Sequence, residues 1–314
     1  MRTAPLVVIA GATATGKTGT SIALATYLRD AGRAVEIVSA DSRQVFRGLD
    51  IGTAKLPVVE RRGIVHHGLD LVDPGDRFTV GDFARHARPI LERLGTIDGA
   101  VAILVGGTGL YLRSIVAGLD LAGLPEDPAV RATLEEDLAR HGREALAARL
   151  VATAPRLAAS TDLRNPRRVV RALELAQLGG DRERPAPTGY PGPHLRLGLV
   201  VPEARLHAER ISARARAQFD AGLVDEARAL RERYDPGLPA FSAIGYREAW
   251  AFLDGAIDRE AAIQLDAHRN VAFARRQRTW FRSELGYEWL DATDDPAGAV
   301  IGRVDRFLAA LPVS

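Results

Sequence analysis

The chain has 314 residues, of which 46% are apolar, so it can form two domains or one domain with a large insertion. The absence of cysteine excludes disulfides, thiolate catalysis and metal sites built on cysteine. The net charge is only +2, although the pI is about 9.1 and only two of the cationic side chains are lysines, Lys17 and Lys55. No apolar run is long enough to cross a bilayer and the N-terminus lacks a signal-peptide pattern, so we expect a cytoplasmic protein without membrane contact.

Short apolar runs that end in glycine or polar residues mark the strands of a sheet. In chain order they cover 6–11, 34–41, 100–107, 195–201 and 287–292. Helical stretches separate the first runs, one beginning after Lys17 and another covering 82–94. This alternation predicts an α/β fold with a parallel sheet flanked by helices on both faces.

Residues 121–190 interrupt the alternation. Asp127–Pro128 and Asn165–Pro166 are signals for the start of a helix, and Gly142 and Gly179–Gly180 are signals for its end. The segment 181–193 carries four prolines and no periodicity, which is typical of a linker. We expect a small helical domain and linker over 121–190, inserted into a core of 1–120 and 191–314. Further helices of that core are predicted over 203–233, 245–253 and 259–283.

The first predicted strand runs directly into "GATATGKT", a phosphate-binding loop of the P-loop type followed by a helix. Glycines let backbone N–H groups turn toward an anion, and the helix N-terminus adds a partial positive charge. A lysine at the end of such a loop supplies a full charge, and the hydroxyl after it can ligate Mg²⁺. The residues of the expected diphosphate-binding loop are Gly11, Ala12, Thr13, Ala14, Thr15, Gly16, Lys17 and Thr18.

Asp41 ends the second apolar run. Ligands collect at the carboxyl ends of parallel strands, so Asp41 is placed to face whatever lies beyond the phosphates. Its position leaves three roles open: Mg²⁺ ligand, general base or turn-forming aspartate. A nucleotide hydrolase also needs an acid at the end of another strand, but the run 100–107 is followed by Thr108. The pattern therefore argues against hydrolysis and leaves group transfer open.

Several segments together resemble one family over nearly the whole chain. In order they are "GATATGKT", "SADSRQVFRGLDIGTAK", "LVGGTGLYLRSIVAGL", "NPRRVVRALEL", "AIGYREAW" and "ARRQRTWFR". They are similar to the tRNA dimethylallyltransferases, also called tRNA isopentenyltransferases. The pair "DSRQVFRGLDIGTAK" and "GGTGLY" is specific to this pattern, whereas the phosphate loop alone is not.

The resemblance implies transfer of a dimethylallyl group from dimethylallyl diphosphate to N6 of the adenine 3′ of the anticodon in tRNA. It implies a catalytic set of Asp41, Thr18 and Arg214, in which Asp41 is the general base, Arg214 binds the diphosphate, and Thr18 ligates the cofactor Mg²⁺. The partner is the anticodon stem-loop of tRNA, and we expect a monomer. The positions implied to contact tRNA are Asp41, Ser42, Arg43, Gln44, Thr108, Arg131, Arg167, Arg168, Val169, Val170, Arg171, Ser242, Ala243, Ile244, Gly245, Tyr246, Arg247, Arg275 and Arg276.

The chain departs from the family pattern at a few positions. Ala12 stands where proline is usual, and Ser242 where glutamine is common. Val271 and Ala272 replace an arginine and a glutamine, which removes the side chains of any tRNA contact there. Lys55 closes a polar segment of the kind expected in a substrate loop. Trp280 and Phe281 are expected to belong to the hydrophobic core.

Two other functions fit parts of the sequence. A P-loop kinase for a small molecule or nucleotide would use Asp41 to bind a substrate hydroxyl or Mg²⁺, but no arginine-rich lid follows the third strand. A non-enzymatic RNA-binding protein with a relic loop would not need an intact Gly16–Lys17–Thr18 together with Asp41.

Overall fold

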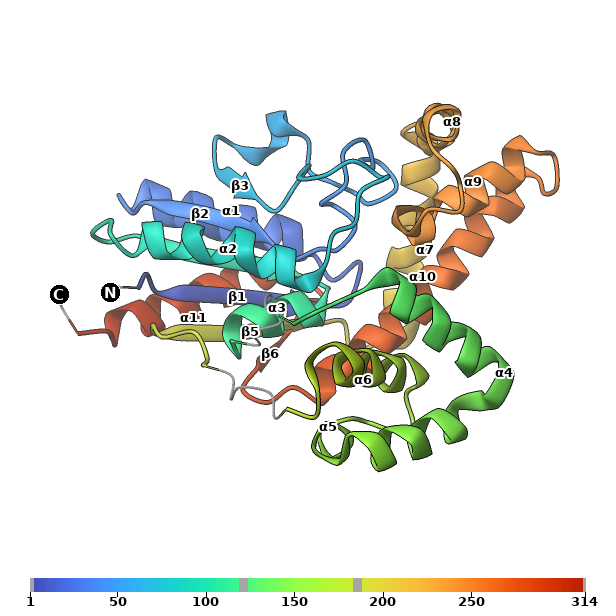
Figure 1. Ribbon diagram of the computed structural model, residues 1–314. Coiled ribbons are helices and arrows are strands. Elements are labelled where there is room, and N and C mark those ends of the chain that lie inside the picture. Colours follow the sequence, from blue (N-terminus) through green and yellow to red (C-terminus); the bar gives the residue numbers. More distant parts are fainter. Residues whose placement is uncertain (1–2, 119–123, 183–187, 313–314) are drawn as a thin grey trace. The chain divides into compact units, whose positions relative to one another are not determined.

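The computed structural model describes residues 3–118, 124–182 and 188–312 (Figure 1). The chain divides into two compact units, Met1–Leu119 with Gly189–Ser314, and Asp120–Thr188. Residue 121, where the predicted insertion begins, and residues 183–187 of the predicted linker lie outside the described residues.

Six parallel strands form the sheet of the first unit, in the order β3-β2-β4-β1-β5-β6. Their bounds are Leu6–Gly11 (β1), Val35–Ser39 (β2), Val65–His67 (β3), Val101–Gly106 (β4), His194–Val200 (β5) and Glu288–Asp291 (β6). The central strand β1 pairs on both sides, so that Val7 lies opposite Ile103 and Leu195. The predicted α/β fold with a parallel sheet is confirmed. The sequence did not predict β3, because its three residues include two histidines and form no apolar run.

Helices cover both faces of this sheet (Figure 1). Alternate side chains of β1 point to opposite faces, so Val7 and Ile9 pack with α1 and α11, while Leu6 and Val8 pack on the side of α2 and α3. The helices of this unit are Lys17–Asp30 (α1), Val80–Leu94 (α2), Gly109–Val116 (α3), Ala204–Asp220 (α7), Leu223–Arg233 (α8), Tyr246–Leu253 (α9), Arg259–Arg282 (α10) and Pro296–Ala309 (α11), with 3₁₀ turns at Val58–Arg61 (η1) and Pro239–Ser242 (η2).

One predicted helix is two helices in the structure. The periodicity of 203–233 continues across Gly222, but this residue has φ 103° and separates α7 from α8. Glycine adopts this left-handed conformation with little penalty, so the chain turns there although the apolar pattern does not break. No helix in the described ranges is both long and apolar enough to span a lipid bilayer.

The second unit is helical and has its own core. Its helices are Pro128–Thr153 (α4), Pro155–Ala159 (α5) and Pro166–Gly179 (α6). The expected starts are confirmed, because Asp127 accepts the N–H of Ala129 at 2.8 Å and Asn165 accepts that of Arg167 at 3.1 Å. At Gly142 the backbone leaves helical geometry with φ 80° and ψ 167°, so α4 consists of two helical stretches, and the predicted end of the first one at Gly142 is confirmed. The core is built from leucines, valines and alanines, among them Leu134, Leu146, Leu150, Leu157, Val169, Val170 and Leu173.

Candidate active site

The segment between β1 and α1 forms a tight loop suited to an anion. Gly16 has φ 82° and precedes α1 without a capping side chain, so the first N–H groups of the helix have no partner within it. Gly11 has to be glycine, because a Cβ there would lie 2.7 Å from the carbonyl oxygen of Leu199. Ala14 also has a left-handed φ of 59°, which costs an alanine about 1–2 kcal/mol. A strained backbone of this kind can direct its amides toward a phosphate.

Helices α7 and α10 hold the loop at Thr13. The Thr13 N–H donates to Oε1 of Gln277 at 2.9 Å, and its hydroxyl accepts from Nη1 of Arg214 at 3.0 Å. Nε2 of His207 lies 2.8 Å from the Thr13 carbonyl oxygen, so this nitrogen carries the proton. Burial lowers the pKa of His207, so the ring is neutral at neutral pH. Gln277 also donates to the carbonyl oxygen of Gly107 at 3.0 Å, which ties the loop to the end of β4.

Lys17 is half-buried at the first position of α1. Its Nζ donates to the carbonyl oxygen of Ala12 at 2.6 Å, across the loop. Burial and the neighbouring Arg214 lower the pKa of Lys17 to about 8, against the opposing effect of Asp41. Because a nearby negative charge favours the protonated form, an anion in the loop would restore the full charge of Lys17.

Asp41 lies two residues beyond the end of β2 and is half-buried. Its Oδ1 accepts the N–H of Arg43 at 2.8 Å and that of Gln44 at 3.3 Å, whereas Oδ2 has no hydrogen bond to any residue that the structure describes. The negative charge of Asp41 acts to raise the pKa values of both Lys17 and Arg214. One oxygen therefore stabilises the turn, while the charge of the carboxylate favours the protonated forms of Lys17 in the loop and Arg214 on α7.

The loop after β4 packs against the turn that carries Asp41. The Thr108 N–H donates to the carbonyl oxygen of Ala40 at 3.2 Å, and the Ser42 N–H donates to Oγ1 of Thr108 at 3.0 Å. Gly106 has to be glycine, because a Cβ there would lie 2.1 Å from the carbonyl oxygen of Ala40. Ser42 and Thr108, two positions implied to contact tRNA, thus lie together beside Asp41.

Arg43 and Gln44 are engaged within the protein. Nη1 of Arg43 donates to the carbonyl oxygen of Pro239 at 2.9 Å, and burial lowers the pKa of this arginine. Nε2 of Gln44 donates to the carbonyl oxygen of Thr53 at 3.1 Å, and its Oε1 accepts from Oγ of Ser39 at 3.1 Å. A tRNA contact by either side chain would replace or share these bonds.

The segment Ser242–Arg247 lies at the start of α9. The side chains of Ser242 and Arg247 are exposed, whereas Tyr246 is fully buried and donates to Oε1 of Glu226 at 2.7 Å. Ala243 and Gly245 are also buried and Ile244 is half-buried. Tyr246 therefore supports the segment from the protein interior. In this conformation an RNA can reach the exposed side chains of Ser242 and Arg247, but not that of Tyr246.

In the second unit, Glu174 binds two of the predicted arginines. Its fully buried carboxylate accepts from Nη2 of Arg131 and Nη1 of Arg171, each at 2.7 Å. Burial alone would raise the pKa of Glu174, but the bonds from these arginines hold the pKa below its ordinary value. Arg167 and Arg168 are exposed at the start of α6. Val169 and Val170 are buried in the core of the unit, so their side chains are not available to a ligand.

Arg275 and Arg276 are exposed on α10, where the Arg276 guanidinium lies 5.7 Å from the ring centre of Phe273. Trp280 packs over Gly109, where an added Cβ would lie 2.1 Å from the indole, and Phe281 is buried. The expectation that these two aromatic residues belong to the core is confirmed.

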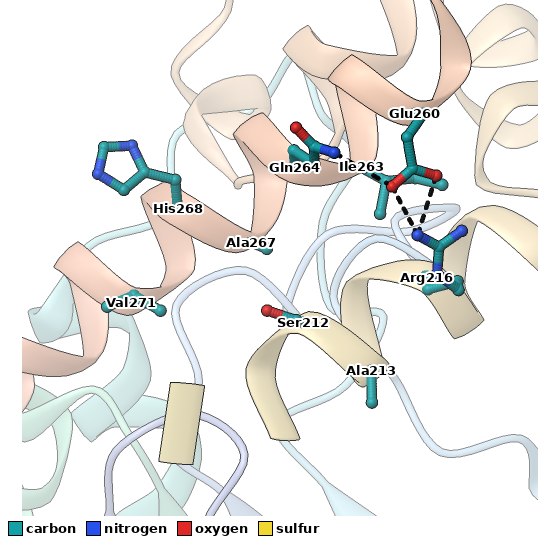
Figure 2. A pocket seen from close by; sticks show the side chains of 9 residues that line it. All are labelled: Ser212, Ala213, Arg216, Glu260, Ile263, Gln264, Ala267, His268 and Val271. Atoms are coloured by element: carbon teal, nitrogen blue, oxygen red, sulfur yellow. Dashed lines mark hydrogen bonds and ion pairs between the residues drawn. The ribbon is translucent and has the colours of Figure 1, made fainter. Parts of the chain in front are cut away.

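A separate pocket of about 450 Å³ lies between α7 and α10. Figure 2 shows the side chains of Arg216 and Glu260 pointing toward each other. Nη2 of Arg216 donates to Oε1 and Oε2 of Glu260 at 2.7 and 2.9 Å. Val271, one of the departures from the family pattern, lines this pocket and also packs against the small cluster of Ala12, Ile211 and Ala274. None of the pocket residues was predicted to contact diphosphate or tRNA.

The sheet, the loop between β1 and α1, and the carboxylate after β2 define a P-loop-type protein whose site suits a phosphate ester. The family model described as IPP transferase matches residues 44–284. The chain is 46% identical over 298 residues to a tRNA dimethylallyltransferase of Anaeromyxobacter sp. (strain K), covering 92% of this chain and 94% of that protein. It is 36% identical to a tRNA dimethylallyltransferase of Halalkalibacterium halodurans, covering 97% and 96%. The chain therefore belongs to the IPP transferase family, as its motifs indicated.

Solved structures agree with this assignment. The full-length tRNA isopentenylpyrophosphate transferase of Bacillus halodurans superposes with a TM-score of 0.69 at 36% identity, covering 97% of this chain and 95% of that chain. A eukaryotic dimethylallyltransferase acting on tRNA shares the fold with a TM-score of 0.76 at 24% identity, covering 99% and 81%. Family membership decides against the kinase alternative.

Proposed function

We propose that this chain transfers a dimethylallyl group from dimethylallyl diphosphate to N6 of the adenine 3′ of the anticodon in tRNA, giving N6-(dimethylallyl)adenosine. The observation that carries the proposal is the placement of Asp41 beside Lys17 and Arg214, at the loop between β1 and α1. One carboxylate and two cations around an anion-binding loop suit a reaction that removes a proton and releases a diphosphate.

In the proposed reaction, N6 forms a bond to C1 of the allyl group while the bond from C1 to the diphosphate oxygen breaks. The N6 amine is a poor nucleophile, because its lone pair is delocalised into the ring, so Asp41 removes its proton during attack. The electron pair of the broken bond leaves with the diphosphate. Lys17, Arg214 and the backbone N–H groups of the loop stabilise the charge that develops there.

The proposal includes Mg²⁺ as a cofactor, which the hydroxyl of Thr18 would help to hold at the diphosphate. The Thr18 residue is exposed in the first turn of α1, beside Lys17, and a hydroxyl together with phosphate oxygens and water is a ligand set that Mg²⁺ accepts. Among the described residues no group of three His, Asp or Glu side chains could hold a metal, so the proposed ion takes its other ligands from the substrate and water. Bound there, Mg²⁺ would neutralise charge on the leaving group.

On the tRNA side, we assign the contacts with the RNA backbone to the exposed members of the predicted set, whereas the half-buried Asp41 contacts the target adenine. Arginines at exposed positions suit the phosphate backbone, and buried members act by holding their neighbours in place. The exposed members are Arg167, Arg168, Ser242, Arg247, Arg275 and Arg276. A monomer that binds the anticodon stem-loop, in the cytoplasm where tRNA is decoded, completes the proposal.

The test is incubation of the purified chain with unmodified tRNA, dimethylallyl diphosphate and Mg²⁺, followed by mass analysis of the tRNA nucleosides. We expect adenosine carrying one added dimethylallyl group, at the position 3′ of the anticodon. A tRNA in which that adenosine is replaced by guanosine is the control and should gain nothing. Hydrolysis of ATP stimulated by tRNA, without prenyl transfer, would contradict the proposal.

A further inference from the structure

Glu226 lies in the first turn of α8, and its carboxylate joins two segments of the first unit. Oε2 accepts the backbone N–H groups of Asp50 at 3.2 Å and of Ile51 at 2.8 Å, and Oε1 accepts that of Gly52 at 3.1 Å. The hydroxyl of Tyr246 also donates to Oε1, at 2.7 Å. One half-buried carboxylate thus binds three consecutive amides of one segment and a side chain of another. The motifs implied no role for this residue.

The three amides lie at the beginning of a tight turn. Within the turn, the Ala54 N–H donates to the carbonyl oxygen of Ile51 at 3.0 Å, whereas the amides before it donate to Glu226, as at a capped helix N-terminus. Bonds from amides to a carboxylate are stronger than bonds between neutral groups. Nε2 of Gln218 on α7 donates to the carbonyl oxygens of Ile51 at 2.6 Å and of Gly52 at 3.0 Å. The turn is therefore held through both its N–H and its C=O groups.

The same turn is tied to Asp41. Nε2 of Gln44 donates to the carbonyl oxygen of Thr53 at 3.1 Å, and the Gln44 N–H donates to Oδ1 of Asp41 at 3.3 Å. One residue thus joins the turn that binds Glu226 to the turn that carries Asp41. A shift of the first turn therefore disturbs the second.

Tyr246 connects Glu226 to residues 242–247 at the start of α9. Its ring is fully buried and packs over Gly52, where an added Cβ would lie 2.6 Å from the ring. Burial and the charge of Glu226 raise the pKa of Tyr246, so its hydroxyl stays protonated and donates. Glu226 is therefore the point at which the segment after Asp41 and the segment at the start of α9 are fastened together.

We propose that Glu226 is a positioning residue for tRNA binding, an inference that rests on the proposed function. It holds residues 41–44 and 242–247, two segments implied to contact tRNA, in one fixed arrangement without contacting the RNA itself. A preformed surface loses less conformational freedom on binding, so this fastening strengthens tRNA binding. The phosphate loop is held at Thr13 by α7 and α10 instead, so diphosphate binding should not depend on Glu226.

The first experiment compares wild type, Glu226→Gln and the control Glu232→Gln, an exposed glutamate of the same helix. Glutamine has one acceptor oxygen and one donor nitrogen, so in either orientation at least one of the three amides loses its acceptor. Filter binding measures tRNA affinity, and calorimetry measures the affinity for inorganic pyrophosphate with Mg²⁺. For Glu226→Gln we expect tRNA affinity to fall about tenfold while pyrophosphate affinity stays unchanged. The amides of residues 50–52 should exchange faster with solvent, and the control should match wild type.

These two affinities separate positioning from a purely structural role. A lower Tm with unchanged tRNA affinity would mean that Glu226 only stabilises the fold. Equal losses of tRNA and pyrophosphate affinity would indicate a general distortion of the unit, and would also overturn the proposal.

A second comparison tests the connection through Tyr246. Tyr246→Phe removes the hydroxyl bonded to Glu226, and we expect tRNA affinity to fall about fivefold. Tyr27→Phe is the matched control, because its hydroxyl also donates to a carboxylate, that of Asp305 at 2.8 Å, outside the predicted tRNA set. In a Glu226→Ala background, Tyr246→Phe should have no further effect, because the hydroxyl has already lost its acceptor. Effects that multiply would overturn the connection.

Failure of the proposed function can be told apart from failure of this inference. If wild type binds tRNA without prenyl transfer, the proposed reaction fails, but the affinity comparison still decides the role of Glu226. If wild type does not bind tRNA, both are overturned. If the variants of Glu226 do not fold, Tyr246→Phe decides the proposal, because it leaves the bonds from residues 50–52 in place.

Discussion

The two lysines of this arginine-rich chain serve different purposes. Nζ of Lys55 is buried and donates to Oδ1 of Asp50 at 2.6 Å, to Oδ1 of Asp70 at 2.5 Å and to the carbonyl oxygen of Phe46 at 2.9 Å. The three donors of a compact ammonium suit acceptors that converge on one point, whereas the donors of a guanidinium are spread over a plane. Lys55 therefore ties its segment to the protein. Its buried ammonium does not face a substrate, although the sequence had suggested that this segment is a substrate loop. Lys17, in contrast, stands in the phosphate loop.

Replacing Asp41 by asparagine should separate binding from chemistry. The amide can still accept the N–H groups of Arg43 and Gln44, so the turn should persist. The proton acceptor is lost, and a general base contributes about 10²–10⁴-fold. We expect the single-turnover rate of transfer to fall by that factor, with tRNA and donor affinities nearly unchanged. A fall of less than about fivefold would remove Asp41 from the role of base.

The basic limb of the pH profile should report Lys17. Its pKa in the free protein is about 8, so above this pH the loop loses the positive charge that binds the diphosphate. We expect kcat/KM for the donor to fall above pH 8, by about tenfold per pH unit at the limit. Lys17→Arg keeps its charge in this range, so its lower activity should lack this limb. If the limb persists in Lys17→Arg, another group is responsible.

At the scale of helices and strands, the sequence predicted the elements that have a clear local pattern. Apolar runs marked five of the six strands, because buried parallel strands are nearly continuous in apolar residues. The cap pairs at Asp127 and Asn165 marked two helix starts correctly. Helices α3 and α11 were not predicted, since α3 begins in a glycine-rich segment and α11 follows a run of polar residues.

The contacts that hold the site join distant parts of the chain, so local sequence patterns could not predict them. Gln277 binds the phosphate loop from 264 residues away, and only its place in the "ARRQRTWFR" segment hinted at a role. His207 was not predicted, because its role depends on burial and on the Thr13 carbonyl oxygen that packing brings within 2.8 Å of its ring. Motif spacing thus located the loop and Asp41, and the family resemblance added Arg214 and Thr108, which bond to Thr13 and Ser42, but neither identified His207.

Gly106→Ala should test how the end of β4 supports the site. The new Cβ would lie 2.1 Å from the backbone carbonyl of Ala40, so the loops after β2 and β4 must move apart and carry Asp41 with them. We expect a loss of about 1–3 kcal/mol in the free energy of unfolding, as in other overpacked sites, and a lower kcat. Chemical denaturation and single-turnover assays measure the two effects.

Gly302→Ala is the matched control for that change. Gly302 lies inside α11, where an added Cβ meets only the end of Arg306 at 3.9 Å. Alanine is favoured over glycine in a helix by about 1 kcal/mol, so this variant should be as stable as wild type or more stable, with unchanged transfer. If the two variants had the same free energy of unfolding and the same transfer rate, crowding at the Ala40 carbonyl would be unimportant.

At the scale of the whole molecule, a small net charge conceals many exposed arginines. Most exposed arginines of the first unit have acidic partners, for example Arg216 with Glu260 and Arg259 with Asp220. In the second unit, Arg131 and Arg171 are committed to Glu174, so removing Arg171 would test the stability of that unit more than its affinity for RNA. Arg167 and Arg168 are better probes of RNA binding, because their side chains are exposed. The helix cap should survive their replacement, because Asn165 accepts their backbone N–H groups and not their side chains.

Combined replacement of Arg167 and Arg168 by alanine should therefore change the salt dependence of tRNA binding. Each arginine that contacts a phosphate displaces condensed counterions, so the slope of log K against log salt should decrease in magnitude by about one to two. Filter binding between low and moderate salt measures the slope, and thermal melts check that the unit stays folded. Arg303→Ala with Arg306→Ala on α11 makes the same charge change outside the predicted tRNA set and should leave the slope unaltered. An unchanged slope in the Arg167 and Arg168 variant would mean that this helix end is solvated when tRNA binds, and that the backbone contacts lie on other arginines.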